Sequence, residues 1–284
     1  MQLIREQDRD RFLSTLFASE NLRPHLWALY AFNLDVARVR EVVKDALPGE
    51  VRLAWWREVI EGQGRGAVEG HPIAAALMDT VERFALPKSA LVNLINARIF
   101  DLYDDAMPSL VDLEGYAGET ASVLIQLSAL ILVPGGAGQV ADLSGHAGVA
   151  IALAGLMRAF PIHAARGQCY LPLDMLEKRG LSKDAALDGQ VREGLMAVLG
   201  ELRMRAGHHV HSAQACLEVL SPELRRHIGV AVLPLSLVPG DLKVLGRVRD
   251  PFHEMPGSTA FMRQFLLWRA AGRLAAGRPL KFRS

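Results

Sequence analysis

The sequence has little cysteine and almost no net charge. Its 284 residues include two cysteines, Cys169 and Cys216, with no metal-ligand spacing around them. This excludes a disulfide framework and a cysteine-based zinc site, and it indicates a reducing compartment. The formal net charge of +1 gives no concentrated positive field, so we expect no nucleic-acid partner.

Signals for export or for a membrane span are also lacking. The N-terminus is charged from Arg5 onward and has no apolar run like that of a secretory signal. The longest apolar run, 121–133, is shorter than the roughly 20 residues of a membrane span, which favours a buried core helix. We therefore expect a cytoplasmic protein. The basic segment 263–284 could rest on the inner membrane as a peripheral contact, or it could be a helix with a solvated basic face.

Helical periodicity runs through most of the chain. In residues 28–43, apolar side chains follow one another at steps of three or four, which places them on one face of a helix. No segment shows sustained strand alternation, and proline and glycine separate the helical runs. The sequence predicts an all-α protein with one domain over 1–284, and 121–133 and 147–157 as its central helix pair. Further helices are expected at about 48–61, 72–84, 88–104, 110–132, 146–160, 190–218, 222–237 and 257–276.

Two clusters of potential ligands have simpler explanations. Asp101, Asp104 and Asp105 would project from one side of a helix and could hold a hard cation, but they also fit a solvated helix end before Pro108. His208 and His211 have a spacing that can ligate zinc, yet no third ligand follows. We interpret these histidines, with His209 beside them, as ordinary surface or interface residues.

Four stretches carry a family resemblance: "RPHLWALYAFN" (23–33), "LAWWREVIEG", "LEGYAGETAS" and "LMRAFPIHAARGQCYLP" (156–172). Together they resemble the squalene/phytoene synthase family over nearly the whole chain. The resemblance implies the isoprenoid synthase fold, a helical bundle around a central apolar cavity. It also implies head-to-head joining of isoprenyl diphosphates, with magnesium held by aspartates on two facing helices.

The aspartates themselves are missing from this chain. Aligned on the family's motifs, the first set falls at Ala37, Arg38 and Glu41, and the second falls at Ala159 and His163. Arg38 and Arg40 would repel a metal ion, so we expect neither a metal site nor a cofactor. Pro161 should bend or end its helix.

The sequence therefore resembles most closely the aspartate-less branch of the family, which includes a mitochondrial complex I assembly factor and its bacterial relatives. This implies a catalytically inactive protein that assists a membrane respiratory complex and contacts its subunits. The cavity could still bind an isoprenoid or another lipid. Arg23, Arg158 and Tyr170 are the candidate ligand contacts, although each could instead cap helices or fill the core. A Glu41–His163 hydrogen bond could replace the bridging metals.

Two alternatives remain open at this point. The first is an active isoprenyl transferase of the phytoene or squalene synthase type, with Mg²⁺ held by Asp101, Asp104 and Asp105 facing Glu41. The second is a lipid carrier with no assembly role, which would carry a bound prenyl chain but no respiratory subunit.

Overall fold

The computed structural model describes residues 1–64, 68–133, 135–189 and 192–281. Within these ranges the chain is helical, and the β-type pairing is limited to one isolated bridge between Ala106 and Cys169. The all-α prediction is confirmed. A helix is expected from residue 190. Residues 190 and 191 lie outside the described residues, and the described helix begins at Arg192.

The α-helices in chain order are α1 (Gln2–Gln7), α2 (Arg9–Thr15), α3 (Arg23–Ala37), α4 (Val39–Val42), α5 (Ala46–Glu61), α6 (Pro72–Phe84), α7 (Lys88–Ile99), α8 (Leu110–Ala117), α9 (Val123–Leu132), α10 (Ala141–Arg158), α11 (Phe160–Ala165), α12 (Leu173–Glu177), α13 (Lys183–Leu187), α14 (Arg192–Val219), α15 (Pro222–Val232), α16 (Val238–Leu245) and α17 (Ala260–Ala275). Tighter or wider turns connect some of them: η1 (Val68–Gly70), η2 (Phe100–Leu102), η3 (Gly118–Ser122), η4 (Ala137–Val140) and η5 (Leu233–Leu237).

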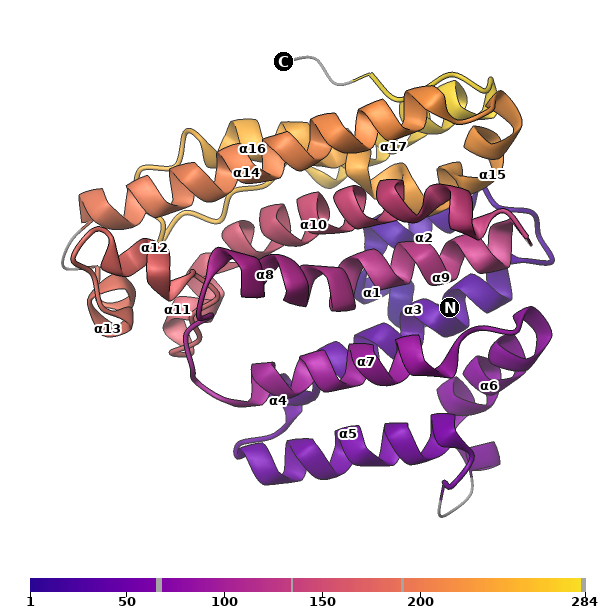
Figure 1. The fold of residues 1–284 in the computed structure, drawn as a ribbon, viewed down its shortest axis with the longest axis horizontal. Coiled ribbons are helices and arrows are strands. Elements are labelled where there is room, and N and C mark those ends of the chain that lie inside the picture. The colour runs from indigo at the N-terminus through magenta and orange to yellow at the C-terminus, as the bar shows by residue number, and fades with distance from the viewer. Residues whose placement is uncertain (65–67, 134, 190–191, 282–284) are drawn as a thin grey trace.

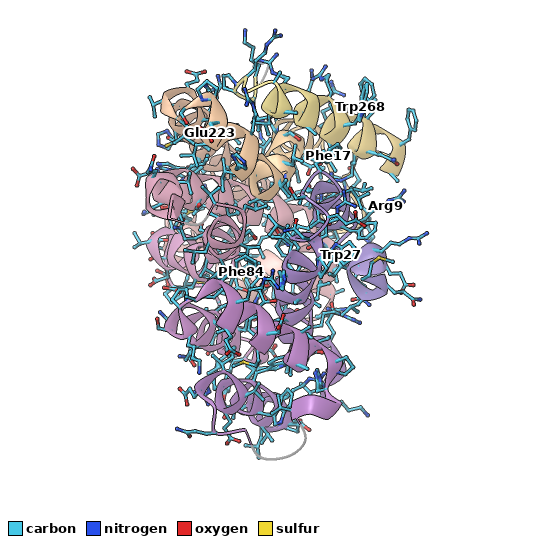
Figure 2. All side chains as sticks on the ribbon, turned by 90° about the vertical axis from the view of Figure 1, so that its right-hand side faces the viewer. Arg9, Phe17, Trp27, Phe84, Glu223 and Trp268 are labelled. Atoms are coloured by element: carbon cyan, nitrogen blue, oxygen red, sulfur yellow. The ribbon has the colours of Figure 1, made fainter. Side chains whose placement is uncertain are left out.

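The helices are arranged in layers, with α5, α6 and α7 at one end of the molecule and α14 to α17 at the other (Figure 1). Between these ends, α10 packs on α14 and α9, while α3 packs on α6 and α9. The central pair predicted at 121–133 and 147–157 corresponds to the end of η3 with α9, and to α10, which contacts both. The outermost layer includes α17, which carries Trp268 on the same side of the molecule as Phe17 (Figure 2).

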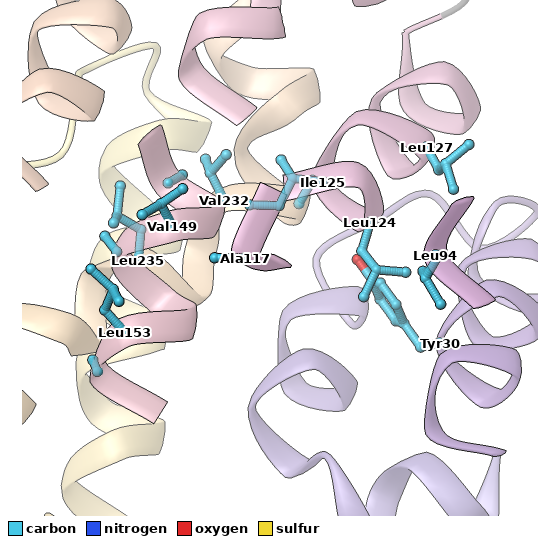
Figure 3. Packing of buried hydrophobic residues seen from close by; sticks show 14 of the residues in the cluster. Tyr30, Leu94, Ala117, Leu124, Ile125, Leu127, Val149, Leu153, Val232 and Leu235 are labelled. Atoms are coloured by element: carbon cyan, nitrogen blue, oxygen red, sulfur yellow. The ribbon is translucent and has the colours of Figure 1, made fainter. Parts of the chain in front are cut away.

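One cluster of buried apolar residues extends from Ile4 to Leu280 and joins these layers (Figure 3). Helix α10 approaches η3 closely. A Cβ atom on Gly148 would lie 2.3 Å from the Cα of Ser122, so only glycine permits this approach. The hydroxyl of Ser122 donates a hydrogen bond of 2.9 Å to the carbonyl oxygen of Gly145, which fixes the two elements together.

Three helical runs of the described chain are long and apolar enough to cross a membrane by length and composition: Leu110–Leu132, Ala137–Arg158 and Pro222–Leu245. The prediction that 121–133 lies in a run too short for a span was wrong, because α8 and η3 extend it to 23 residues. The prediction of a core helix is supported, since 61% of the apolar window in this run is buried inside the fold.

Candidate functional site

The two segments that hold the altered motif positions lie opposite each other. The helix expected over 28–43 is divided in two, because α3 ends at Ala37 and α4 begins at Val39. On the facing side, α10 ends at Arg158 and α11 carries Pro161 in its first turn. A proline is tolerated there because the first turn has no helical partner for an N–H group. The predicted helix break at Pro161 is confirmed.

Glu41 joins these two segments through arginines. Arg166 Nη1 on the second segment donates to Glu41 Oε1 at 3.3 Å, and Arg38 Nε donates to Glu41 Oε2 at 3.1 Å. Partial burial opposes ionisation of this carboxyl, but the bonds from both arginines hold the pKa of Glu41 below its ordinary value. The guanidinium group of Arg166 therefore links the two segments that the family resemblance expects a metal ion to bridge.

The hydrogen bond expected between Glu41 and His163 does not form. The His163 ring instead packs on the ring of Tyr170, with centroids 4.7 Å apart, and burial lowers the pKa of His163. Arg166 takes the place expected for His163 because its longer, permanently charged side chain reaches the carboxylate. Ala37 and Ala159 have no side-chain atom that could bind a metal.

Asp101 is buried at the centre of a hydrogen-bonded cluster. Its carboxylate accepts from the hydroxyls of Tyr170 at 2.7 Å and Tyr116 at 2.8 Å, and from Arg98 Nη1 at 3.1 Å. Its own carbonyl oxygen accepts from Gln168 at 3.3 Å. The interpretation of Asp101 as part of a solvated helix end was wrong. The chain turns inward through η2 after α7, which carries this carboxylate into the interior.

The charges in this cluster are mutually dependent. Burial raises the pKa of both Tyr116 and Tyr170, and the negative charge of Asp101 raises them further, so both phenols stay protonated and donate. Burial alone would lower the pKa of Arg98, but Tyr116 and Asp101 raise it above the ordinary value. The Asp101 carboxylate is therefore already neutralised by an arginine.

Asp104 lies next to the first motif segment but is exposed. Arg40 Nη2 donates to Asp104 Oδ1 at 3.3 Å, which ties the segment after η2 to α4. The transferase alternative required Asp101, Asp104 and Asp105 to face Glu41 as a magnesium platform. Asp101 and Asp104 do lie at this end, but each is paired with an arginine, as Glu41 is.

The carboxylates present do not fit the magnesium ions that the fold family implies. Magnesium needs several carboxylate or water oxygens free to complete an octahedron, and an adjacent guanidinium repels the ion. Among the described residues, no group of three or more His, Cys, Asp or Glu side chains is placed to hold a metal ion. We therefore derive no metal-dependent step for this site.

Side chains pack closely where His163 and Tyr170 meet α8, α10 and α14. The void that remains measures about 10 Å³, no more than a single water molecule needs. A prenyl chain would have to displace its walls. The void is lined by Leu113, Leu153, Leu156, Met157, Phe160, His163, Tyr170, Leu171 and Leu202.

The three predicted ligand contacts have different hydrogen-bond partners. Arg23 begins α3, about 20 Å of helix away from Arg38, and donates to the carbonyl oxygens of Ala18 and Leu16 at 3.1 Å. Arg158 binds a different carboxylate, and Tyr170 binds Asp101. Arg158 lines the cleft between α2, α10 and α17, whereas Tyr170 lines the void near His163, so their role in ligand binding stays a prediction.

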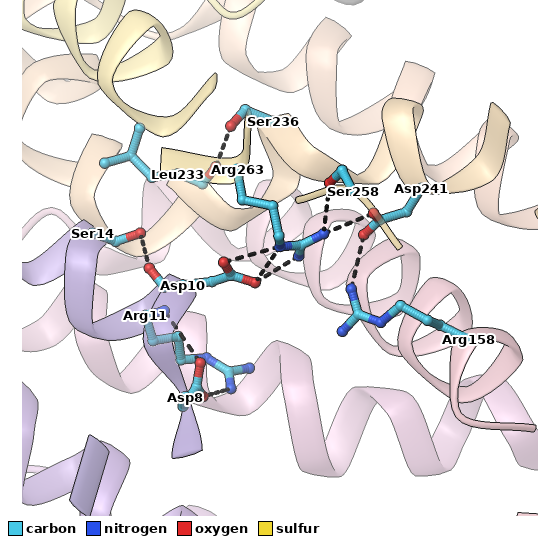
Figure 4. A network of polar contacts seen from close by, with 10 residues as sticks. All are labelled: Asp8, Asp10, Arg11, Ser14, Arg158, Leu233, Ser236, Asp241, Ser258 and Arg263. Atoms are coloured by element: carbon cyan, nitrogen blue, oxygen red, sulfur yellow. Dashed lines mark hydrogen bonds and ion pairs between the residues drawn. The ribbon is translucent and has the colours of Figure 1, made fainter. Parts of the chain in front are cut away.

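A second charged network surrounds Arg158 (Figure 4). Arg158 Nη1 donates to Asp241 Oδ2 at 3.1 Å, and Arg263 Nη1 donates to Asp241 Oδ1 at 2.7 Å. Arg263 also binds Asp10, with its Nη2 2.6 Å from Asp10 Oδ2. This network joins α2, α10, α16 and α17 and lines a cleft of about 270 Å³. Sequence reasoning missed Arg263 and Asp241 because nothing in their local pattern indicates their partners.

The histidines of α14 do not form a zinc site. His208 and His211 are exposed, whereas His209 is buried and contacts His146 Nδ1 at 2.9 Å and Glu114 Oε1 at 3.0 Å. Because Glu114 can only accept, His209 Nε2 donates and its Nδ1 accepts from His146. The signal for this burial was present in the sequence, since Leu202, Ala206 and His209 follow at helical spacing on the buried face of α14.

Comparison with known proteins places this geometry in a family. The profile of the squalene/phytoene synthases matches residues 4–250. The chain belongs to the squalene/phytoene synthase family. Solved structures of this family share the fold: a dehydrosqualene synthase superposes with a TM-score of 0.74 at 16% identity, covering 96% of this chain and 94% of the other. A squalene synthase from Alicyclobacillus acidocaldarius gives 0.68 at 22% identity, covering 87% and 90%.

Among curated members of the squalene/phytoene synthase family, this chain is similar to complex I assembly factor 6. The rat protein (Rattus norvegicus) is 30% identical over 76% of this chain and 64% of its own length. The human protein (Homo sapiens) is 28% identical over the same shares. This chain thus spans 64% of the length of these relatives. A phytoene synthase from Thermus thermophilus is 25% identical over 72% of this chain and 69% of its own length.

Proposed function

We propose that this chain is a catalytically inactive synthase-fold protein that helps to assemble a membrane-bound, complex I-like NADH dehydrogenase. In this proposal it works at the inner face of the membrane and contacts respiratory subunits. The observation that carries the proposal is the pairing of Glu41, Asp101 and Asp104 with arginines at the end where a synthase would ionise its diphosphate substrate. The similarity to complex I assembly factor 6 supports the assembly role.

The loss of catalysis has a direct physical reason. Breaking the carbon–oxygen bond of an allylic diphosphate leaves concentrated negative charge, which needs preorganised cations that are free to bind it. Here Arg38 and Arg166 are engaged by Glu41, and Arg98 by Asp101. Binding a diphosphate would require these pairs to break.

The first test is incubation of the purified chain with farnesyl or geranylgeranyl diphosphate and Mg²⁺. We expect diphosphate release no faster than with heat-denatured protein. Turnover that disappears in a Glu41→Gln variant would contradict the proposal and support the transferase alternative.

The second test addresses assembly. Deletion of the gene in its source organism should lower the NADH:quinone oxidoreductase activity of the membranes and the amount of intact complex. Wild-type protein and Glu41→Gln should restore both equally, because the role needs no catalysis. Full activity in the deletion strain would overturn the assembly role.

A lipid ligand is the second part of the proposal. A pocket of about 120 Å³ adjoins the void near His163 and Tyr170, between α10, α14 and residues 245–256, and its wall includes Met157, Leu199 and Val248. Mass spectrometry of an organic extract of the purified protein tests this part. A stoichiometric prenyl chain without any captured NADH dehydrogenase subunit would favour the carrier alternative.

A further inference from the structure

Helix α17 has two apolar faces, and only one of them is covered by the protein. Leu267, Ala270, Ala271 and Leu274 are buried where α17 packs on η5, α15 and α2. A second stripe follows Phe261, Phe265 and Trp268 at steps of four and three, so these side chains lie on one side of the helix. A helix that needed only to dock on the core would not carry this second stripe.

The second stripe is exposed. Phe261 is 78% exposed, Trp268 64% and Phe265 44%. Leu16 and Phe17, at the end of α2, extend the patch and are 41% and 46% exposed. Figure 2 shows Trp268 on α17 above Phe17 on the same side of the molecule. We call this patch the α17 face, consisting of Leu16, Phe17, Phe261, Met262, Phe265 and Trp268.

The α17 face is hollowed rather than flat. A groove of about 300 Å³ runs between the end of α2 and the aromatic side chains of α17, with Phe17 and Trp268 on its two walls. A second depression of about 410 Å³ adjoins it and is bordered by Arg269, Arg273 and Arg278. The exposed aromatic side chains of α17 and these three arginines therefore form one continuous surface.

Positive charge is concentrated beside this face. The sequence contains six basic and no acidic residues after Glu254, although the whole chain carries a net charge of only +1. Arg263 is engaged by Asp10 and Asp241, whereas Arg269 and Arg278 are exposed. Besides Asp10 and Asp241, which pair with Arg263, neighbouring segments carry Glu20, three residues after Phe17, and Glu223 at the start of α15.

We propose that the α17 face binds the surface of an anionic phospholipid bilayer. Phenylalanine and tryptophan enter the boundary between head groups and acyl chains, and adjacent arginines attract the anionic phosphates. This chemistry favours a lipid surface over a second copy of the chain, because two copies facing each other here would bring their arginines together. The inference specifies the membrane contact of the proposed function, but vesicle binding tests it without any respiratory subunit.

The test measures binding of the full chain to vesicles of phosphatidylcholine, with and without phosphatidylglycerol. We expect binding to the anionic vesicles that weakens as salt is added, and little binding to the neutral ones. A Phe261→Ser/Phe265→Ser/Trp268→Ser variant should lose at least about tenfold in affinity, since three aromatic side chains no longer enter the bilayer. The matched control is Val51→Ser/Val111→Ser, which removes two side chains that are 64% and 78% exposed on other helices and should bind like wild type.

Trp268 supplies an independent signal. Trp56 is fully buried and Trp27 and Trp55 are partly buried, so a blue shift of the fluorescence on vesicle addition should come from Trp268 and vanish in Trp268→Phe. Equal binding of the triple-serine variant and wild type, or equal binding to neutral and anionic vesicles, would overturn the proposal. So would a dimer in sedimentation velocity that the triple variant abolishes, because a second copy would then cover the face. Failure of vesicle binding would leave the complementation test of the assembly role unaffected.

Discussion

The Asp101 cluster and the Glu41–Arg166 bridge lie at the same end of the molecule but differ in their access to water. The Asp101 side chain is 7% exposed and accepts from three side chains, while the Glu41 side chain is 40% exposed and that of Arg166 46%. Both replace the expected metal chemistry with arginine pairs. We infer that the buried cluster contributes to the stability of the fold. The exposed Glu41–Arg166 pair contributes less, because water screens the attraction between its charges.

Asp101→Ala should give the largest effect. It would leave Arg98 buried without its carboxylate and would remove the acceptor of the Tyr116 and Tyr170 hydroxyls. Losing one partner of a buried charge pair costs about 3–5 kcal/mol. Urea unfolding monitored by circular dichroism measures this, and Asp104→Ala, at an exposed carboxylate of the same segment, is the control. If Asp101→Ala lowers the free energy of unfolding no more than Asp104→Ala does, the buried Asp101 carboxylate does not stabilise the fold.

Arg263→Ala should have the next largest effect. Arg263 binds Asp10 and Asp241 together and thereby holds α17 on α2 and α16. Arg158 would still compensate Asp241, so we expect a loss of about 2–4 kcal/mol, below that of Asp101→Ala. Urea unfolding again measures the loss. The control is Arg269→Ala, an exposed arginine of the same helix, which should change stability little.

The histidine pair predicts a pH dependence of stability. Burial lowers the pKa of His209 in the folded protein, and the Glu114 carboxylate opposes this effect only in part. The unfolded chain therefore takes up a proton first. Stability should be complete above about pH 6.5 and should fall as the pH drops below it towards the lower folded pKa.

His163 and His25 have pKa shifts of the same sign, so a His209→Gln variant should keep part of this dependence. Urea midpoints between pH 8 and pH 5 measure it. A slope in the variant as steep as in wild type would show that His209 does not contribute.

Arg166→Ala should have the smallest effect. Its bond to Glu41 is exposed on both sides, and such pairs contribute about 0–1 kcal/mol. We expect a urea midpoint close to that of wild type and the same low diphosphate release. If Arg166→Ala lowered stability as much as Asp101→Ala does, the exposed bridge would matter to the fold as much as the buried cluster.

Much of the fold could be predicted from the sequence because helical periodicity is local. The apolar spacing and the proline and glycine breaks located most helices, and the position of Pro161 predicted the end of α10. The errors include short helices that were not expected, α1, α2, α12 and α13, and one helix junction. Arg38 divides the helix expected over 28–43, whereas the helix expected over 110–132 is present as α8, η3 and α9.

The site was less predictable because its contacts join distant parts of the chain. Glu41 and Arg166 are 125 residues apart, and Asp101 and Tyr170 are 69 residues apart. The acidic run at 101–105 looks like a solvated helix end when its neighbours are unknown. Only the packing of α7, η2 and the segment after α11 turns Asp101 inward.

The sequence by itself determined that this protein is helical and that the aspartates of both motif positions are absent, since periodicity and residue identity need no tertiary partner. The tertiary structure decided which arginine meets each carboxylate, how closely side chains pack around His163 and Tyr170, and which apolar side of α17 stays exposed. Those outcomes depend on the distances between side chains of different helices, which are fixed only when the helices pack.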